Sequence, residues 1–135
     1  MRRQALAITG ALMLAGLATA PLARAQTGVA SLARGEQVYA RCLACHALAY
    51  DRVGPRHCGL FGRRAGTVPG FAYSLAMKQV GITWDTRTLD RFLAAPTKVI
   101  PGTTMTYDGV PDQHQRAELI AYLRQVDQTP ACRTR

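Results

Sequence analysis

The sequence predicts an all-α domain whose helices are joined by long loops. Three stretches, around residues 31–47, 85–95 and 112–126, place apolar side chains at helical intervals of three and four. The segments between them are broken by Gly and Pro, and no stretch shows the alternation of a β-strand. Because so little regular structure buries only a small core, we expect a bound cofactor to complete it.

The first expected helix runs from Ser31, at or near its N-cap, to about Ala47. Gly35 lies inside this helix, where glycine costs about 1 kcal/mol relative to alanine. The glycine therefore either marks a close approach by another helix or is tolerated near the helix start.

The middle of the chain is predicted to contain one extended loop and two helices. Residues 50–70 hold repeated Gly and Pro and form the loop, and residues 71–78 are expected to form a short helix. The next helix is capped by Asp85 or Thr86 and is ended by Pro96, because proline cannot continue a helix.

The last third is predicted to be a loop followed by the final helix. Residues 98–110 carry turn signals on both sides of Met105. Asp112, followed three residues later by Gln115, resembles a capping box that opens a helix. The apolar stripe of this helix consists of Leu119, Ile120, Leu123 and Val126.

The first 25 residues have the features of a signal peptide. Arg2 and Arg3 precede an apolar run over residues 5–20, and small residues stand at the sites that signal peptidase reads before Ala25. We therefore expect export to the periplasm, cleavage after Ala25 and one mature domain over residues 26–135. The alternative is an uncleaved anchor, but the run falls short of the roughly 20 apolar residues that span a bilayer.

The chain is basic, with a formal net charge of +9 that falls to +6 once Arg2, Arg3 and Arg24 leave with the signal peptide. Such a balance suits nucleic acid, an anionic membrane surface or acidic protein partners, and export argues against nucleic acid. No later stretch is long and apolar enough to cross a membrane. We expect a soluble monomer without stable membrane insertion.

Cys42, Cys45 and His46 form the attachment pattern of a c-type haem. One helical turn lets both sulfurs reach the porphyrin edge, and the histidine can then face the iron. The alternatives, a redox dithiol or half of a zinc site, fit less well. The chain carries an export signal, its loops need a core, and it lacks a second pair of zinc ligands at the required spacing.

The second axial ligand must come from a distant part of the chain. The candidates are Met77, Met105, His57, His114 and an open position. Met105 lies in a loop that could hold its thioether against the iron, but a methionine more often serves core packing. Spacing alone therefore favours Met105 only modestly over Met77.

Further motifs are spread from Gly35 to about Gln125, and on them the chain resembles the class I cytochromes c of mitochondria and bacterial periplasms. The motifs are Gly35 with Tyr39, the run Cys42-Leu43-Ala44-Cys45-His46, Gly54-Pro55, Gly59-Leu60-Phe61-Gly62-Arg63, Tyr73, Gly81 with Trp84, Ile100-Pro101-Gly102-Thr103-Thr104-Met105, and Leu119-Ile120-Ala121-Tyr122-Leu123. The resemblance implies a small fold in which the N- and C-terminal helices cross and loops wrap around one covalent haem. The crossing is expected at Gly35, with Tyr39 and Tyr122 packed beside it.

The resemblance also assigns roles to individual residues. His46 and Met105 become the axial ligands, and the Pro55 carbonyl orients the His46 ring. Buried haem propionates need donors or positive charge in a low-dielectric pocket. The resemblance assigns this task to Arg63, Tyr73 and Trp84, and Thr103 is expected to contact the haem.

At two positions the chain departs from the family pattern. Phe92 stands where the family usually has a tyrosine that reaches the methionine sulfur, and Met77 replaces a usual polar side chain. A drier pocket disfavours ferric charge and raises the reduction potential, whereas loss of the hydrogen bond to sulfur lowers it. The two effects oppose one another, so the net sign is not predicted.

Haem attachment leaves Cys58 and Cys132 as a second pair of cysteines. A disulfide between them would close a loop of 74 residues and, in the chain-entropy model, stabilise the fold by roughly 4 kcal/mol. The alternative is two separate thiols.

The expected function is one-electron transfer rather than catalysis, because both axial positions are filled. We expect transient docking to acidic sites on respiratory or photosynthetic membrane complexes, with Arg41, Lys78 and Lys98 around the exposed haem edge. The alternatives are a dedicated electron acceptor of one periplasmic dehydrogenase and a peroxidase or ligand-binding haem protein. These alternatives differ in stable co-purification with a partner and in rapid binding of cyanide or carbon monoxide.

Overall fold

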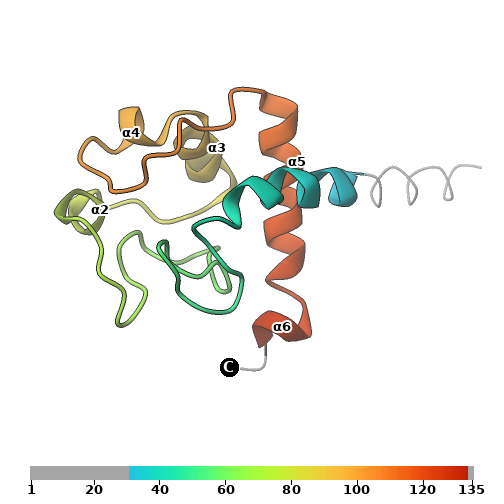
Figure 1. Cartoon of the computed structure of the whole chain (residues 1–135), viewed down its shortest axis with the longest axis horizontal. Coiled ribbons are helices and arrows are strands. Elements are labelled where there is room, and N and C mark those ends of the chain that lie inside the picture. The colour runs from blue at the N-terminus through green and yellow to red at the C-terminus, as the bar shows by residue number, and fades with distance from the viewer. Residues whose placement is uncertain (1–30, 134–135) are drawn as a thin grey trace, which may run out of the picture.

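The computed structural model describes residues 31–133 as helices joined by long loops (Figure 1). The predicted signal peptide and the cleavage after Ala25 lie outside these residues. Within them the only strand-like feature is an isolated bridge between Arg64 and Thr83. The predicted all-α class is confirmed.

Helices of different lengths follow one another along the described chain. A helix over residues 31–39 continues into the 3-10 turn η1, and later helices are mostly short. Their bounds are η1 Ala40–Cys42, α2 Leu75–Gln79, α3 Thr86–Ala94, α4 Pro96–Val99, α5 Gln113–Val126 and α6 Pro130–Arg133.

The first helix is shorter than predicted, and its expected end at Ala47 is wrong. Ser31 is already helical, so it lies inside the helix and not at its cap. The chain leaves the helical path after Cys42, and the Cys45 carbonyl accepts a hydrogen bond from Gly54 N at 2.7 Å. Beyond Cys42, a hydrogen bond to the following loop replaces those that would continue the helix as far as Ala47.

The first helix crosses α5 at Gly35 (Figure 1). A Cβ atom at this position would lie 2.7 Å from Cβ of Tyr122 and would also meet the Glu118 carbonyl. The Tyr39 and Tyr122 rings pack beside the crossing, with centroids 5.4 Å apart. Of the two interpretations of Gly35, close helix approach is the correct one.

Helix starts follow the predicted capping residues. The Asp85 carboxylate accepts a hydrogen bond from Thr88 N at 2.7 Å, and the Thr88 hydroxyl accepts one from Asp85 N at 2.8 Å. At α5, Asp112 accepts from Gln115 N at 2.8 Å. Such caps satisfy N–H groups that lack partners within the helix.

Two short helices were not predicted. Pro96 ends the path of α3 but also begins α4, so Lys98 is helical and not part of the expected loop. Proline suits this position because its missing N–H is not needed in the first turn of a helix. The second unpredicted helix, α6, follows α5 near the C-terminal end.

A disulfide between Cys58 and Cys132 joins the long loop to α6, with the two Cα atoms 5.1 Å apart. The pairing that the sequence left open is therefore formed. Next to it, the Asp127 carboxylate accepts a hydrogen bond from Gly59 N at 2.5 Å. The C-terminal end of the described chain is thereby tied to the loop that precedes α2. None of the helices within residues 31–133 is long and apolar enough to cross a bilayer.

Candidate haem site

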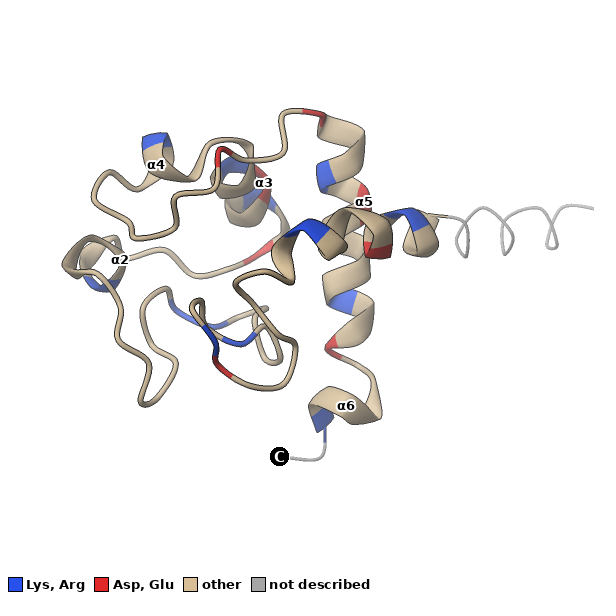
Figure 2. Cartoon of the chain, in the orientation of Figure 1, with Lys and Arg blue, Asp and Glu red and all other residues tan. Residues whose placement is uncertain are grey.

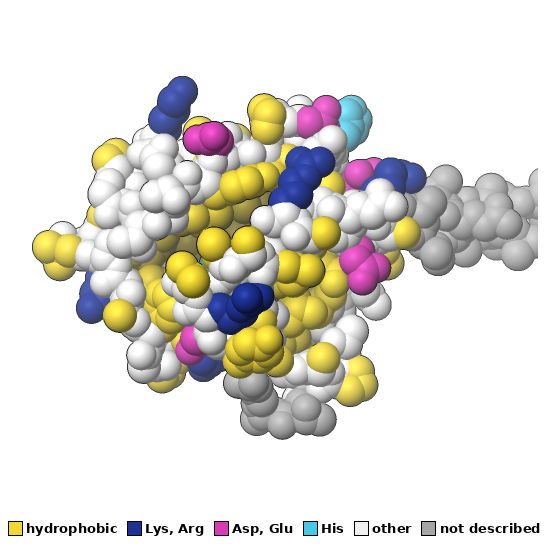
Figure 3. All heavy atoms as spheres, viewed as in Figure 1, with side chains coloured by type: hydrophobic (Ala, Val, Ile, Leu, Met, Phe, Trp, Pro, Cys, Tyr) yellow, Lys and Arg dark blue, Asp and Glu magenta, His cyan; other side chains and the backbone are white. Residues whose placement is uncertain are grey.

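A hollow lined mainly by apolar side chains opens on one face of the molecule (Figure 3). The first helix and the following loop form one side of it, and α3 with the Met105 loop forms the other. Apolar residues from α3 and α5 close its interior, including Leu89, Phe92, Leu93, Leu119 and Leu123. The apolar core is therefore arranged around a hollow that the helices and loops do not fill by themselves.

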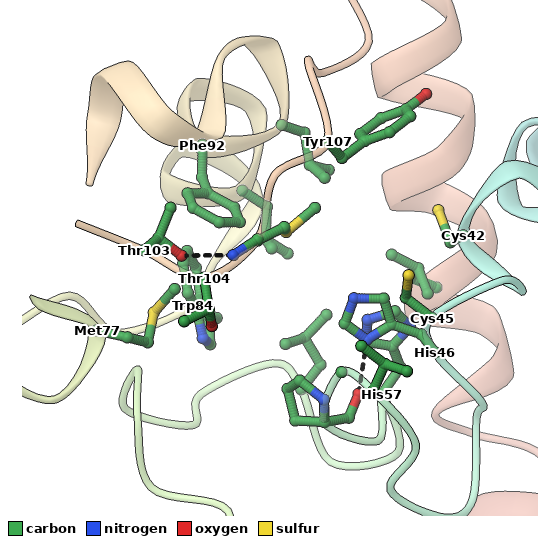
Figure 4. Close-up of a pocket in the computed structure, with 18 of the residues that line it drawn as sticks. Cys42, Cys45, His46, His57, Met77, Trp84, Phe92, Thr103, Thr104 and Tyr107 are labelled. Atoms are coloured by element: carbon green, nitrogen blue, oxygen red, sulfur yellow. Dashed lines mark hydrogen bonds between the residues drawn. The ribbon is translucent and has the colours of Figure 1, made fainter. Parts of the chain in front are cut away.

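Cys42, Cys45 and His46 lie together on one side of the hollow (Figure 4). Both cysteines are free thiols, and they are one turn apart at the end of the first helix. Burial raises the pKa of the Cys42 thiol to about 11, although Arg41 opposes the rise. Neither sulfur is used in a disulfide, so both are available for thioether bonds to a haem.

The His46 ring is held by the loop that follows it. Its Nδ1 lies 2.8 Å from the Pro55 carbonyl oxygen, the partner that the resemblance implied. A Cβ on Gly54 would lie 2.6 Å from Nδ1 and 2.7 Å from Nε2, so only glycine leaves room for the ring. Burial lowers the pKa of His46, which favours the neutral imidazole that binds metal ions.

His57 also faces the hollow and stacks on His46. The two ring centroids are 4.3 Å apart with an interplanar angle of 22°. Nδ1 of His57 and the Tyr39 hydroxyl form a hydrogen bond of 3.1 Å. Burial, together with His46 and Arg63, lowers the pKa of His57 to about 3, so the ring is neutral at physiological pH.

The Met105 loop borders the hollow from the opposite side, where Phe92, Thr103, Thr104 and Met77 also lie (Figure 4). Met105 is partly buried, and its backbone N–H donates to Thr103 Oγ1 at 3.2 Å. Met77 contributes to the same wall from α2 and is 8% exposed. Both methionines therefore border the pocket.

The apolar substitutions predicted to dry the pocket are buried in its wall. Phe92 is 6% exposed, and its ring lies 5.1 Å from that of Trp84. Phe92 and Met77 both line the hollow, and neither side chain carries a hydroxyl or amide group.

The three predicted propionate partners line the hollow near one another in the chain. Trp84 is fixed by backbone pairing, since its N–H donates to Arg63 O at 2.9 Å and its carbonyl accepts from Gly62 N at 2.8 Å. Burial raises the pKa of Tyr73, and the nearby Arg63 opposes the rise. Two nitrogens of the Arg63 guanidinium donate hydrogen bonds to main-chain carbonyls, those of Arg56 and Cys58, each at 3.0 Å.

These donors fit a covalently attached haem. Two free thiols stand one turn apart at the pocket edge, an oriented imidazole follows them, and a thioether lies in the facing wall. The walls are apolar, as a porphyrin requires, and polar side chains are confined to a few positions. In residues 31–133, no group of three or more His, Cys, Asp or Glu side chains converges on an alternative metal position.

Comparison with known proteins gives matches across most of the chain. A family model described as Cytochrome c matches residues 32–127. Cytochrome c2 of Blastochloris viridis is 47% identical over 96 residues, which cover 69% of this chain and 76% of that protein. Cytochrome c of Chlamydomonas reinhardtii is 42% identical over 105 residues, covering 75% of this chain and 94% of that protein.

A solved structure shares the fold. Cytochrome cH from Methylobacterium extorquens aligns with a TM-score of 0.68 at 41% sequence identity, covering 70% of this chain and 97% of that chain. The fold, the pocket and these similarities show that the chain belongs to the cytochrome c family, within class I. It carries one covalent c-type haem and is an electron carrier, not an enzyme.

Sequence reasoning missed two contributions to this site. It considered His57 only as a candidate ligand and did not foresee its stacking on His46, because the two rings meet through the fold of a loop, which residue spacing does not specify. It also gave Arg63 only a haem-binding role, whereas the side chain bridges the carbonyls on both sides of His57. The Gly54-Pro55 pair was a usable signal, since a glycine before the orienting proline indicates a close approach.

Proposed function

We propose that this chain is a soluble periplasmic one-electron carrier whose haem iron is bound by His46 and Met105. The observation that carries the proposal is the His46 ring, whose Nδ1 is engaged by Pro55 O at 2.8 Å. Nε2 is then the nitrogen left for a metal, in a pocket that Met105 also lines and that the loop with Thr103 and Thr104 borders from the other side.

The haem supplies an iron that accepts and releases one electron at a time. The residues of the chain keep the surroundings of the iron the same in the oxidised and the reduced state. Cys42 and Cys45 would hold the porphyrin edge covalently, and the apolar walls would exclude water from the iron. With His46 and Met105 both bound to the iron, no coordination position would be left for a substrate.

Arg63, Tyr73 and Trp84 are proposed to hold the propionates, with Thr103 also in contact with the haem. Each lines the hollow, and each brings an N–H or O–H group to a low-dielectric setting. The Arg63 guanidinium has five N–H donors in all, so its bonds to two carbonyls leave others for a carboxylate. Charge-assisted bonds of this type offset the cost of burying the propionates.

Docking is proposed to be transient and electrostatically guided. Arg41 is exposed at the pocket edge, and Lys78 and Lys98 are exposed on α2 and α4 (Figure 2). Positive charge around the exposed haem edge favours acidic sites on membrane redox complexes, either respiratory or photosynthetic. Export is supported by the predicted signal peptide and by the Cys58–Cys132 disulfide, a bond typical of oxidising compartments.

The absorption spectrum of the purified ferric protein tests the ligand assignment. We expect the weak far-red band that a thioether sulfur gives on ferric haem, with loss of the band in Met105→Ala and its retention in Met77→Ala. The Met77 variant is the matched control, because both methionines border the same pocket. High-spin ferric iron with rapid cyanide or carbon monoxide binding would overturn the assignment and favour a ligand-binding haem protein.

A further inference from the structure

His57 lies against the proposed iron ligand but has no part in the electron transfer described above. Its ring is nearly parallel to that of His46, 22° from coplanar orientation, at a centroid distance of 4.3 Å. It also borders the haem pocket. The ring thus forms a flat neighbouring surface for His46.

The His57 ring is itself held in place at its far end. Its Nδ1 is hydrogen-bonded to the Tyr39 hydroxyl at 3.1 Å, and the two rings meet edge to face at 5.5 Å. Tyr39 is buried at the helix crossing, 2% exposed, and packs on Tyr122. The hydrogen bond therefore joins His57 to the buried crossing of the first helix and α5.

The backbone on both sides of His57 is also fixed. His57 N donates to the carbonyls of Ala47 and Leu48, at 3.2 and 3.1 Å, which lie directly after His46 in the chain. Arg63 donates to the carbonyls on both sides of His57, and the next residue, Cys58, is cross-linked to Cys132. The plane of the His57 ring is therefore fixed, and the His46 ring can take its orientation from it.

His46 needs such a plane because its hydrogen bond to Pro55 leaves one motion free. The bond restrains the position of Nδ1, but a single hydrogen bond does not by itself fix the rotation of the ring plane. Stacking against a fixed ring opposes that rotation. Partners of a metal-bound histidine commonly set ring orientation in this indirect way.

We propose that His57 is a positioning residue that, together with Tyr39, sets the rotation of the His46 ring about its bond to iron. The proposal rests on the proposed ligation by His46. The rotation of an axial imidazole decides which iron d orbitals its π system meets, so it changes the electronic asymmetry of ferric haem without changing the ligands.

Electron paramagnetic resonance and proton NMR of the ferric holoprotein read this rotation. We expect His57→Leu to change the g values and the spread of the haem methyl shifts while the iron stays low-spin. His57→Phe keeps a flat ring without the hydrogen bond, and Tyr39→Phe keeps His57 but removes the hydroxyl. Both are expected to change the same signals in the same direction, by less than His57→Leu. The control is His114→Leu, an exposed histidine on α5, which should leave them unchanged.

Unchanged g values and methyl shifts in a folded His57→Leu protein would show that His57 only packs. If that variant fails to fold, His57→Phe and Tyr39→Phe decide the question, and wild-type signals in both would overturn the proposal. Failure of the ligand assignment is distinguishable, because the wild-type ferric protein itself would then lack low-spin iron and the far-red band.

Discussion

The two walls of the haem pocket are secured in different ways. The His46 segment, residues 42–63, is held along its length by backbone hydrogen bonds, the Arg63 guanidinium and the Cys58–Cys132 disulfide. The Met105 segment, residues 100–112, is held mainly at its ends. Ile100 and Val110 are 2% and 1% exposed, and Val110 N donates to Leu93 O at 2.7 Å.

Between these ends the Met105 segment has fewer bonds. Thr103 N donates to Ile100 O at 3.1 Å, and Met105 N donates to the Thr103 hydroxyl at 3.2 Å. Segments with few buried contacts open at lower free energy than the rest of a protein. We therefore expect the His46 wall to persist until global unfolding, whereas the Met105 wall detaches first.

The largest expected effect comes from removing the cross-link of the His46 segment. Closing a loop of 74 residues stabilises the fold by about 4 kcal/mol in the chain-entropy model. The double variant Cys58→Ser/Cys132→Ser should therefore lose about 4 kcal/mol of unfolding free energy. Guanidinium unfolding followed by circular dichroism measures this loss.

The single variant Cys132→Ser is the control for the serine at position 58, and it should lose a similar amount. Under native conditions the far-red band should persist in both variants, because the disulfide does not hold the Met105 segment. Selective loss of that band without global destabilisation would contradict the division between the two walls.

A smaller effect is expected from Arg116, which anchors the end of the Met105 segment. Its Nη1 donates to Val110 O at 2.9 Å and to Pro111 O at 2.8 Å, and its Nε pairs with Asp90 at 2.7 Å. Arg116→Met leaves a buried carbonyl unpaired and should cost about 2 kcal/mol.

The loss of stability should be confined to the Met105 wall of the pocket. We expect Arg116→Met to lose the far-red band at a lower guanidinium concentration than the helical circular dichroism, with a wider gap than in the wild type. Arg91→Met, an exposed arginine on α3, is the control. A shift of both transitions by the same amount would show that the two walls open as one unit.

The smallest expected effect concerns the start of α3, which carries Phe92 into the Met105 side of the pocket. Hydrogen bonds from Thr88 lower the pKa of the Asp85 carboxyl in the folded state. A lowered folded-state pKa means that the cap stabilises above the ordinary pKa of aspartate and that this contribution is lost as the pH falls through the lowered value.

Asp85→Ala should therefore be less stable than the wild type at about pH 7, with the difference shrinking by about pH 2. Asp85→Asn keeps a capping oxygen without a titrating group, so its stability at neutral pH should stay close to that of the wild type. Unfolding midpoints at the two pH values measure the effect. A difference between Asp85→Ala and the wild type that does not depend on pH would argue against the carboxylate cap.

Helix positions were predictable wherever a local signal exists. Asp85 and Asp112 cap helices at the expected positions, because the cap is made by residues a few positions apart. The end of the first helix was not predictable, because Gly54 takes the Cys45 carbonyl from a separate loop. The helix α4 was missed because Pro96 both stops one helix and begins the next.

The sequence by itself determined the class of fold, the attachment of haem at Cys42 and Cys45, and the membership of the cytochrome c family. These properties depend on residue types at short spacing, and that spacing can be read directly from the sequence. Tertiary structure decided that Cys58 pairs with Cys132, that Gly35 marks a helix crossing, and that His57 stacks on His46. Such contacts join segments distant in sequence or turned by a loop, so they depend on how the chain packs around its pocket.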